Sequence, residues 1–184
     1  MKTYYLSIIF MFLSRVFSYK NMNLCKQKNL QRILTKRYLK TSIFTVGKRS
    51  GGEKWIADGI SEYEKRLKPT MDITTTFVKS NDDLINKVDN QMKSKGIVYA
   101  LDENGKEYSS IKFSKLVYDA FIEGGSSISF VIGGAEGLPS SLKSSLPLIS
   151  LSKLTFTHTH ARLILYEQIY RATEIHKGSK YHKA

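Results

Sequence analysis

Short apolar and β-branched runs alternate with segments of helical periodicity along the chain from Thr41 onward. The apolar runs predict strands at residues 42–46, 73–78, 97–101, 128–132 and 148–151, the last of them short. The run at 97–101 (IVYAL) is unbroken in its apolar character, which is typical of a strand buried on both faces of a sheet.

Between and after these runs, apolar residues recur at the three- and four-residue spacing of amphipathic helices. The helical segments lie at residues 56–67, 82–95, 113–123 and 162–175. Asn81 is the predicted N-cap of the second helix and Gly96 its predicted C′ residue, and Asn104-Gly105 predicts a turn. Strand-helix alternation at this spacing predicts an α/β fold, with a mostly parallel sheet and helices on both faces.

The glycine-rich loop after the fourth strand is a candidate ligand site. Open α/β sheets bind ligands beyond the carboxyl ends of their strands, here the loops after Leu101, Ile132 and Leu151. Residues 133–137 (GGAEG) follow Ile132, and their missing side chains let a ligand approach backbone amides. The loop has neither the Gly-Lys-Ser/Thr ending of a P-loop nor the position of a dinucleotide-binding motif. From its chemistry alone it is equally well an ordinary tight turn.

The net charge of +13 is unevenly distributed along the chain. Residues 1–40 carry nine Lys and Arg and no Asp or Glu, whereas from Thr41 onward 20 cations face 16 anions, a balance of +4. A basic segment without acids is typical of an organelle presequence, so we expect residues 1–40 to be a targeting segment and residues 41–184 the folded domain. The single cysteine, Cys25, excludes a disulfide framework, a Cys-rich zinc module and an iron-sulfur cluster.

The basic segment opens with an apolar run, residues 4–13 (YYLSIIFMFL), that is similar to the core of a secretory signal. A signal-like run followed by a basic segment predicts two-step import into a plastid bounded by extra membranes, and a mitochondrial presequence is the plainer alternative. The run has about half of the ~20 residues that a membrane-spanning helix needs. A membrane anchor is therefore disfavoured, and we expect no stable membrane association after import.

Several segments of the folded region together resemble one protein family. They are, in order, Val46-Gly47-Lys48 with Trp55, residues 61–67 (SEYEKRL), Ala100-Leu101-Asp102, residues 130–138 (FVIGGAEGL), residues 151–156 (LSKLTF), His158 with Arg162, Glu167 with Tyr170-Arg171-Ala172, and Tyr181-His182-Lys183. On these segments, which cover the region from about residue 42 to the last residue, the chain is identified as a member of the RlmH family of SPOUT-class methyltransferases.

The resemblance implies an S-adenosylmethionine-dependent methyl transfer to N3 of a pseudouridine in large-subunit, 23S-type rRNA, here of an organelle. It also implies a C-terminal trefoil knot, a homodimer, and large-subunit rRNA or the ribosome as partner. General topology rules alone would have excluded a knot. The alternatives are a SPOUT methyltransferase that acts on another RNA such as tRNA, and a catalytically idle RNA-binding factor in ribosome assembly.

The family's cofactor contacts carry over by position to the three strand ends identified above. The implied S-adenosylmethionine-binding residues are Leu101, Gly133, Leu151, Ser152, Lys153, Leu154, Thr155 and Phe156. Backbone donors and acceptors between apolar walls can bind adenine without a dedicated charged pair. We expect the side chains of Leu101 and Leu154 to pack in the core as well, which backbone contacts would allow.

Catalysis is expected from a histidine-arginine pair and from the C-terminal tail. The N3–H group is a weak acid, and its proton is lost only to a base or with a cation that stabilises the forming anion. His158 and Arg162, at i and i+4, supply both if the last helix already includes His158. Tyr181 and His182 are suited to stacking on a base, and the resemblance implies that this tail completes the active site, reaching across the dimer.

No metal is expected at this site. The His158-x-His160 pair has no third ligand nearby in the sequence, and methyl transfer from a sulfonium needs no metal. Thr157 and Thr159 stand where prolines flank the histidine in many members of the family, which predicts a less rigid loop here.

Overall fold

The structure, a computed structural model, describes residues 39–48, 53–94 and 96–183. The predicted targeting segment, residues 1–40, lies outside the described residues except for its last two positions. The described body is built on a five-stranded sheet in the order β2-β1-β4-β3-β5, with every neighbouring pair parallel. The strands are β1 (Leu39–Val46), β2 (Met71–Val78), β3 (Ile97–Glu107), β4 (Ser127–Ile132) and β5 (Leu148–Ser150).

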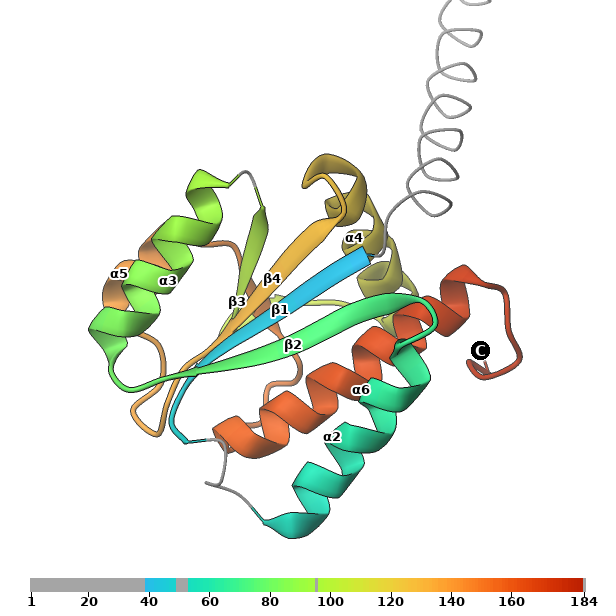
Figure 1. Ribbon diagram of the computed structural model, residues 1–184, viewed down its shortest axis with the longest axis horizontal. Helices are drawn as coiled ribbons and strands as arrows, with labels where there is room; N and C mark the ends of the chain where they lie inside the picture. The colour runs from blue at the N-terminus through green and yellow to red at the C-terminus, as the bar shows by residue number, and fades with distance from the viewer. Residues whose placement is uncertain (1–38, 49–52, 95, 184) are drawn as a thin grey trace, which may run out of the picture. The chain divides into compact units, whose positions relative to one another are not determined.

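Helices cover both faces of this sheet (Figure 1). They are α2 (Lys54–Leu67), α3 (Asn81–Lys93), α4 (Ser110–Glu123), α5 (Ser140–Ser145) and α6 (His158–His176). α3 and α5 lie on one face, and α2, α4 and α6 lie on the other. The predicted α/β fold, with a parallel sheet between two helical layers, is confirmed.

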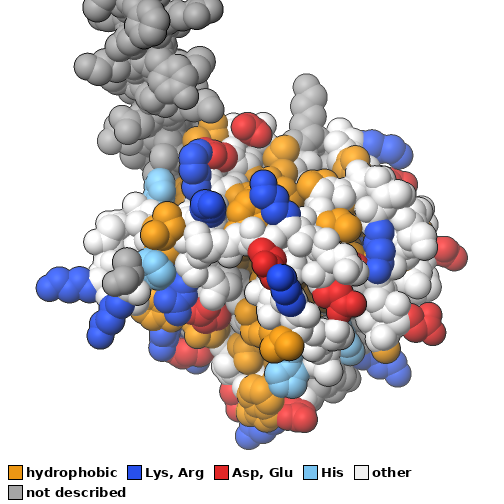
Figure 2. Space-filling model, turned by 180° about the vertical axis from the view of Figure 1, so that it is seen from behind, with side chains coloured by type: hydrophobic (Ala, Val, Ile, Leu, Met, Phe, Trp, Pro, Cys, Tyr) orange, Lys and Arg blue, Asp and Glu red, His pale blue; other side chains and the backbone are white. Residues whose placement is uncertain are grey.

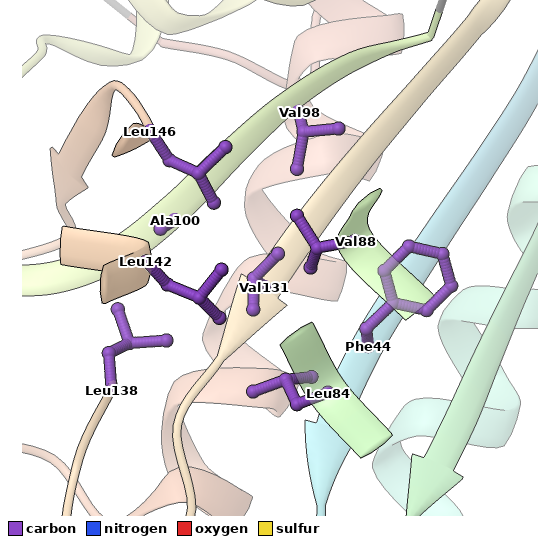
Figure 3. Close-up of a cluster of buried hydrophobic side chains, with 9 residues drawn as sticks. All are labelled: Phe44, Leu84, Val88, Val98, Ala100, Val131, Leu138, Leu142 and Leu146. Atoms are coloured by element: carbon purple, nitrogen blue, oxygen red, sulfur yellow. The ribbon is translucent and has the colours of Figure 1, made fainter. Parts of the chain in front are cut away.

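The face under α3 and α5 is closed by aliphatic side chains and one phenylalanine. Figure 3 shows this cluster, which consists of Phe44, Leu84, Val88, Val98, Ala100, Val131, Leu138, Leu142 and Leu146. Side chains alternate between the faces of a strand, so Phe44 and Val131 point to this side while their neighbours Ile43 and Phe130 are buried on the other. β1 and β4 are therefore buried on both faces. In the run 97–101 of β3, where the sequence predicted burial on both faces, Val98 and Ala100 are buried and the alternate residues are only half-buried.

The opposite face is covered by α2, α4 and α6, and α6 carries two of the candidate catalytic residues. The hydroxyl of Tyr166, on α6, donates to Glu64 Oε1 of α2 at 2.9 Å and lies 3.0 Å from Thr75 Oγ1 of β2. Burial raises the pKa of Tyr166, so the hydroxyl stays protonated and keeps its donor. These bonds fix α6 against both α2 and the sheet edge.

The second predicted helix differs from the structure at both ends. Its N-cap is Ser80, one residue before the predicted Asn81, because Ser80 is extended and its hydroxyl accepts the N–H of Asp83 at 3.1 Å. Its C-cap is Ser94, so the predicted C′ residue, Gly96, lies one position too far along the chain. Serine and asparagine are both good N-caps, and the sequence pattern could not choose between adjacent ones.

The predicted turn at Asn104-Gly105 is wrong, because both residues lie within β3. Leu101 and Lys106 of β3 both pair with Ile149 of β5, so the register shifts between them and residues 102–105 form a bulge-like irregularity inside the strand. The N–H of Asn104 still donates to Asp102 Oδ1 at 3.0 Å. An added Cβ at Gly105 would lie 2.6 Å from the Ile149 carbonyl carbon, so glycine is needed there for close strand approach.

Two further boundaries and one short helix differ from the sequence predictions. β1 begins at Leu39, so the boundary predicted after residue 40 falls inside this strand, whose first side chain is buried. α5 was not predicted at all, because a six-residue helix with one buried side chain carries almost no periodic signal. α6 begins at His158, four residues before the predicted start, since Thr157 caps it and accepts the His160 N–H.

The surface of the body carries both signs of charge. On the face drawn in Figure 2, Lys and Arg side chains are interspersed with Asp and Glu. This agrees with the balance of +4 from Thr41 onward. In the described parts of the chain, none of the helices combines the length and the apolar character that a membrane crossing requires.

Candidate active site

A cavity of about 350 Å³ opens at the carboxyl ends of β4 and β5 and beside the middle of β3, where the pairing of β3 with β5 shifts register. Its walls come from the middle of β3, from the end of β4, from the loops that follow β4 and β5, from Lys143 of α5, and from the first turn of α6. The residues that line it are Leu101, Asp102, Glu103, Ile132, Gly133, Gly134, Ala135, Glu136, Gly137, Leu138, Lys143, Leu151, Ser152, Leu154, Thr155, Phe156, His158 and Ala161. The sequence placed a ligand site beyond strand ends at Leu101, Ile132 and Leu151. The structure has a cavity at all three residues, although β3 does not end at Leu101 but continues to Glu107.

The glycine-rich loop after β4 folds back on itself and presents backbone to the cavity. The Gly137 N–H donates to the Gly134 carbonyl at 3.1 Å, and Gly137 has a φ of 79°, a conformation that L side chains rarely adopt. An added Cβ at Gly133 would lie 2.3 Å from the Gly137 carbonyl carbon and 2.6 Å from the Leu138 nitrogen. Gly133 is therefore required by close backbone packing, and this wall of the cavity consists of peptide groups.

The segment between β5 and α6 forms the facing wall. The Ser150 hydroxyl donates to the Ser152 carbonyl at 2.7 Å, and the Leu154 N–H donates to Ser152 Oγ at 3.1 Å, which fixes the local bend. Seven of the eight predicted cofactor residues line the cavity; the exception, Lys153, lines an open hollow beside Glu103 instead. Leu154 is 69% exposed, so the expectation that its side chain packs in the core is wrong.

An ion pair that the sequence did not single out also lines the cavity. Lys143 Nζ lies 2.8 Å from Asp102 Oδ2, and the Asp102 side chain is only 8% exposed. The Lys143 ammonium, together with the Asn104 N–H, holds the pKa of Asp102 below its ordinary value against the opposing effect of burial. The sequence signal was an aspartate directly after the apolar run 97–101, but its partner Lys143 comes from α5, which the sequence did not predict.

His158 and Arg162 lie on successive turns of α6 but do not share a cavity. His158 lines the cavity at the strand ends, whereas Arg162 lines a second cavity beside α2 and β2. His160 points elsewhere: its Nδ1 lies 2.7 Å from Thr157 Oγ1 and its ring packs 5.3 Å from that of Trp55. Within residues 39–48, 53–94 and 96–183, no three His, Cys, Asp or Glu side chains are grouped to hold a metal ion.

The C-terminal tail packs on the far end of α6. The Tyr181 ring lies 5.0 Å from that of Tyr170 and 4.9 Å below the Arg171 guanidinium, and its hydroxyl donates to Glu167 Oε1 at 3.3 Å. Burial, followed by the nearby Glu167 charge, raises the pKa of Tyr181 to about 12. The buried His182 Nδ1 has no hydrogen-bond partner among the described residues.

This placement separates the tail from the cavity of its own chain. His158 and Tyr170 stand twelve positions apart on α6, which is about 18 Å at ~1.5 Å per residue. The structure therefore brings His158 together with the predicted cofactor residues, and it leaves Arg162, Tyr181 and His182 outside that cavity.

Known proteins resemble this chain over the whole described body. Residues 39–182 match the family model described as Predicted SPOUT methyltransferase. The chain is 46% identical over 145 residues to the Ribosomal RNA large subunit methyltransferase H of Protochlamydia amoebophila, which covers 79% of this chain and 99% of that protein. It is 41% identical over 161 residues to the protein of the same name from Streptococcus uberis, covering 79% and 100%.

A solved structure is similar at a lower level. The SpoU methyltransferase AviRb from Streptomyces viridochromogenes, in complex with AdoMet, superposes with a TM-score of 0.44 and 10% identity over 80% of this chain and 62% of that chain. That likeness is too low to support an argument about fold or ligand. The family match and the two relatives suffice: the chain belongs to the SPOUT methyltransferase family and, within it, to the RlmH family.

Proposed function

We propose that this protein transfers a methyl group from S-adenosylmethionine to N3 of a pseudouridine in large-subunit rRNA. The observation that carries the proposal is the cavity between the middle of β3 and the carboxyl ends of β4 and β5, which lies in a chain whose relatives are named large-subunit rRNA methyltransferases. Its volume of about 350 Å³ is in the range of small-molecule sites.

The walls of the cavity fit the cofactor. The peptide groups around Gly133 and the segment 151–156 offer donors and acceptors to an adenine ring, with Ile132 and Leu138 as apolar walls. Asp102, Glu103 and Lys143 add carboxylates and an ammonium that suit the charged groups of the cofactor's sulfonium amino-acid end. When bound, the cofactor supplies an activated methyl group, so the protein needs no metal to make the carbon reactive.

His158 is the proposed proton acceptor. It lines the cavity from the first turn of α6, where the Thr157 cap holds the helix start. A neutral imidazole can take the N3 proton as the new carbon–nitrogen bond forms and the carbon–sulfur bond breaks. Arg162, predicted as its partner, faces away from this cavity and is assigned no part in proton removal.

We also propose a knotted homodimer in which each tail completes the partner's site. The tail of one chain packs about 18 Å along α6 from its own His158. If two copies pack with their α6 helices antiparallel, Tyr181 of the partner subunit can lie at the cavity. A composite site of this kind explains why a basic aromatic tail is ordered against α6 and yet remote from its own cavity.

The test is methylation of large-subunit rRNA followed by mass spectrometry of the modified nucleoside. We expect methylpseudouridine with the full chain, and loss of product with His158→Gln or with removal of residues 181–184. His160→Gln is the matched control, because His160 is on the same helical turn and does not line the cavity. Calorimetry should show that the truncated protein still binds S-adenosylmethionine.

Each alternative predicts a different result. A methylated tRNA with unmodified rRNA would identify a SPOUT enzyme of another target. Binding of rRNA without S-adenosylmethionine binding would identify an idle assembly factor. Full activity after truncation would contradict the composite site.

The chain's location is a separate proposal: residues before β1 direct import into an organelle, a plastid rather than a mitochondrion. It is supported by the acid-free basic composition and the signal-like run at 4–13. Because Leu39 is buried in β1, any removal of the segment should occur before that residue. Residues 1–38 fused to a fluorescent protein should reach the plastid; mitochondrial fluorescence would support the plainer alternative, and cytosolic fluorescence would contradict import.

A further inference from the structure

A second cavity, of about 610 Å³, lies beside the edge strand β2 and under α2. It is separate from the strand-end cavity and shares no lining residue with it. Its lining combines apolar side chains with the cations Arg162, Lys65 and Lys68 and with the hydroxyl groups of Ser61 and Thr74. Neither the family match nor the methyl-transfer chemistry gives this cavity a role.

Arg162 is the unusual residue of this cavity. It is only 8% exposed, and its Nε is buried without a hydrogen-bond partner in the described part of the chain. Its guanidinium lies 4.8 Å from the centre of the Phe77 ring, and no carboxylate of the described residues forms an ion pair with it. Burial lowers the pKa of Arg162 in spite of the opposing effects of the nearby Tyr166 and Glu64, as expected where a charge is held away from water.

A buried cation is retained at such cost only when something compensates it. Within the described residues, the carboxylate of Glu64 faces this cavity but accepts the hydroxyl of Tyr166, and Asp72 is exposed. Three cations therefore line the cavity against two carboxylates, and the most buried of the five groups is the guanidinium. The chemistry that satisfies it is an oxyanion, which accepts from guanidinium N–H groups in a planar fork.

We propose that this cavity is a phosphate-binding site for the backbone of the RNA substrate, with Arg162 as its main ligand and Lys65 at its rim. Arg162 is one helical turn after His158, about 6 Å along α6. An RNA strand whose target base enters the strand-end cavity beside His158 can therefore place a neighbouring phosphate against α2 and β2. The anion site stands on the geometry alone, and its assignment to RNA rests on the proposed function.

The first experiment measures thermal unfolding of the full chain in inorganic phosphate and in chloride at equal ionic strength. We expect phosphate to raise the melting temperature of the wild type and not that of Arg162→Gln. Arg162→Lys, which keeps the charge but loses the planar fork, should show a reduced shift. An equal shift in the wild type and Arg162→Gln would overturn the anion site.

The second experiment measures affinity for a large-subunit rRNA fragment over a range of salt concentrations. Arg162→Gln should weaken binding about tenfold or more. The slope of log affinity against log salt should become less steep by about 0.9, the value for one lost phosphate contact. Lys65→Gln provides a variant at an exposed position, where folding is not at risk, and should give a smaller loss of the same kind. Glu62→Gln on the exposed face of α2 outside the cavity is the matched control and should not weaken binding.

Calorimetry with S-adenosylmethionine separates this inference from the proposed function. Unchanged cofactor affinity with weakened RNA binding supports the phosphate site. If RNA affinity and salt slope are unchanged in Arg162→Gln and Lys65→Gln, the assignment of the anion site to RNA is overturned. If these variants change the dimer dissociation constant and not RNA affinity, the occupant of the cavity is a carboxylate of the partner chain. If the wild type binds no S-adenosylmethionine, the proposed function fails, whereas the phosphate-dependent shift still decides the anion site.

Discussion

Gly133 offers the sharpest test of the strand-end cavity, because the single methyl group that alanine would add there clashes with the backbone of the same loop. In Gly133→Ala, the added Cβ would lie 2.3 Å from the Gly137 carbonyl carbon, 2.5 Å from its oxygen and 2.6 Å from the Leu138 nitrogen. All three are backbone atoms, so no side-chain rotation relieves the contact. The loop must retreat by about 1 Å to reach an ordinary van der Waals separation.

The expected cost follows from overpacking. Inserting a methyl group into a well-packed site destabilises a protein by about 1–3 kcal/mol. For a domain of this size, that range lowers the melting temperature by about 3–10 °C. Because the displaced atoms also form the cavity wall, the affinity for S-adenosylmethionine should fall about tenfold or more, which corresponds to about 1.4 kcal/mol or more of lost binding free energy.

Calorimetry of cofactor binding and thermal unfolding should be measured together, with Gly125→Ala as control. Gly125 follows α4 with a φ of 64°, and an added Cβ there meets no atom within 4 Å in the described part of the chain. That variant should lose about 1–2 kcal/mol of stability through its left-handed backbone and leave cofactor affinity unchanged. Wild-type affinity in Gly133→Ala, or an equal loss of affinity in Gly125→Ala, would refute the reasoning.

Three other predictions concern stability. Lys143 holds the pKa of Asp102 below its ordinary 3.8, so the pair stabilises the fold above that pH and this stabilisation is lost as pH falls through the depressed pKa. When urea unfolding is measured from pH 7 to pH 2, the free energy of unfolding should fall less in Asp102→Asn than in the wild type. An identical pH profile would contradict the role of the pair. Ser80→Ala should lose about 1 kcal/mol of unfolding free energy and Asn81→Ala much less, the reverse order being evidence against the observed cap. Burial lowers the pKa of His176 from 6.5, so stability should fall as pH drops below 6.5, and this dependence should be reduced in His176→Gln when unfolding is measured between pH 7 and pH 5.

The long elements could be predicted from the sequence because their burial is periodic. β4 is buried at five consecutive positions, and the run at 128–132 is correspondingly apolar. α5 has a single buried side chain, Leu142, in six residues, so its existence depends on packing against β3 that no local pattern records. The Asn104-Gly105 pair shows the opposite failure, in which strong turn chemistry is overridden by pairing with β5.

Only those parts of the site that lie at predicted strand ends or in family motifs could be predicted from the sequence. Strand polarity places Leu101, Ile132 and Leu151 at one edge of the sheet, and all three line the cavity, but the expected strand end at Leu101 was wrong because β3 continues to Glu107. The Asp102–Lys143 pair was missed because it joins a strand end to the unpredicted α5. Helical spacing correctly put His158 and Arg162 on neighbouring turns, but it could not show that they face different cavities.

The interior position of β1, between β2 and β4, sets the timing of folding during synthesis. Thr41 pairs with Ile73 on one side and with Ile128 on the other, so the second partner is made 87 positions later. At about 5–20 residues per second, a ribosome needs roughly 4–17 s to cover that distance. Throughout that interval β1 has at least one unpaired edge, and side chains that the complete fold buries are still exposed, a combination that favours aggregation. The nascent chain should therefore depend on chaperone binding until β4 emerges, and the sheet forms from its middle only late in translation.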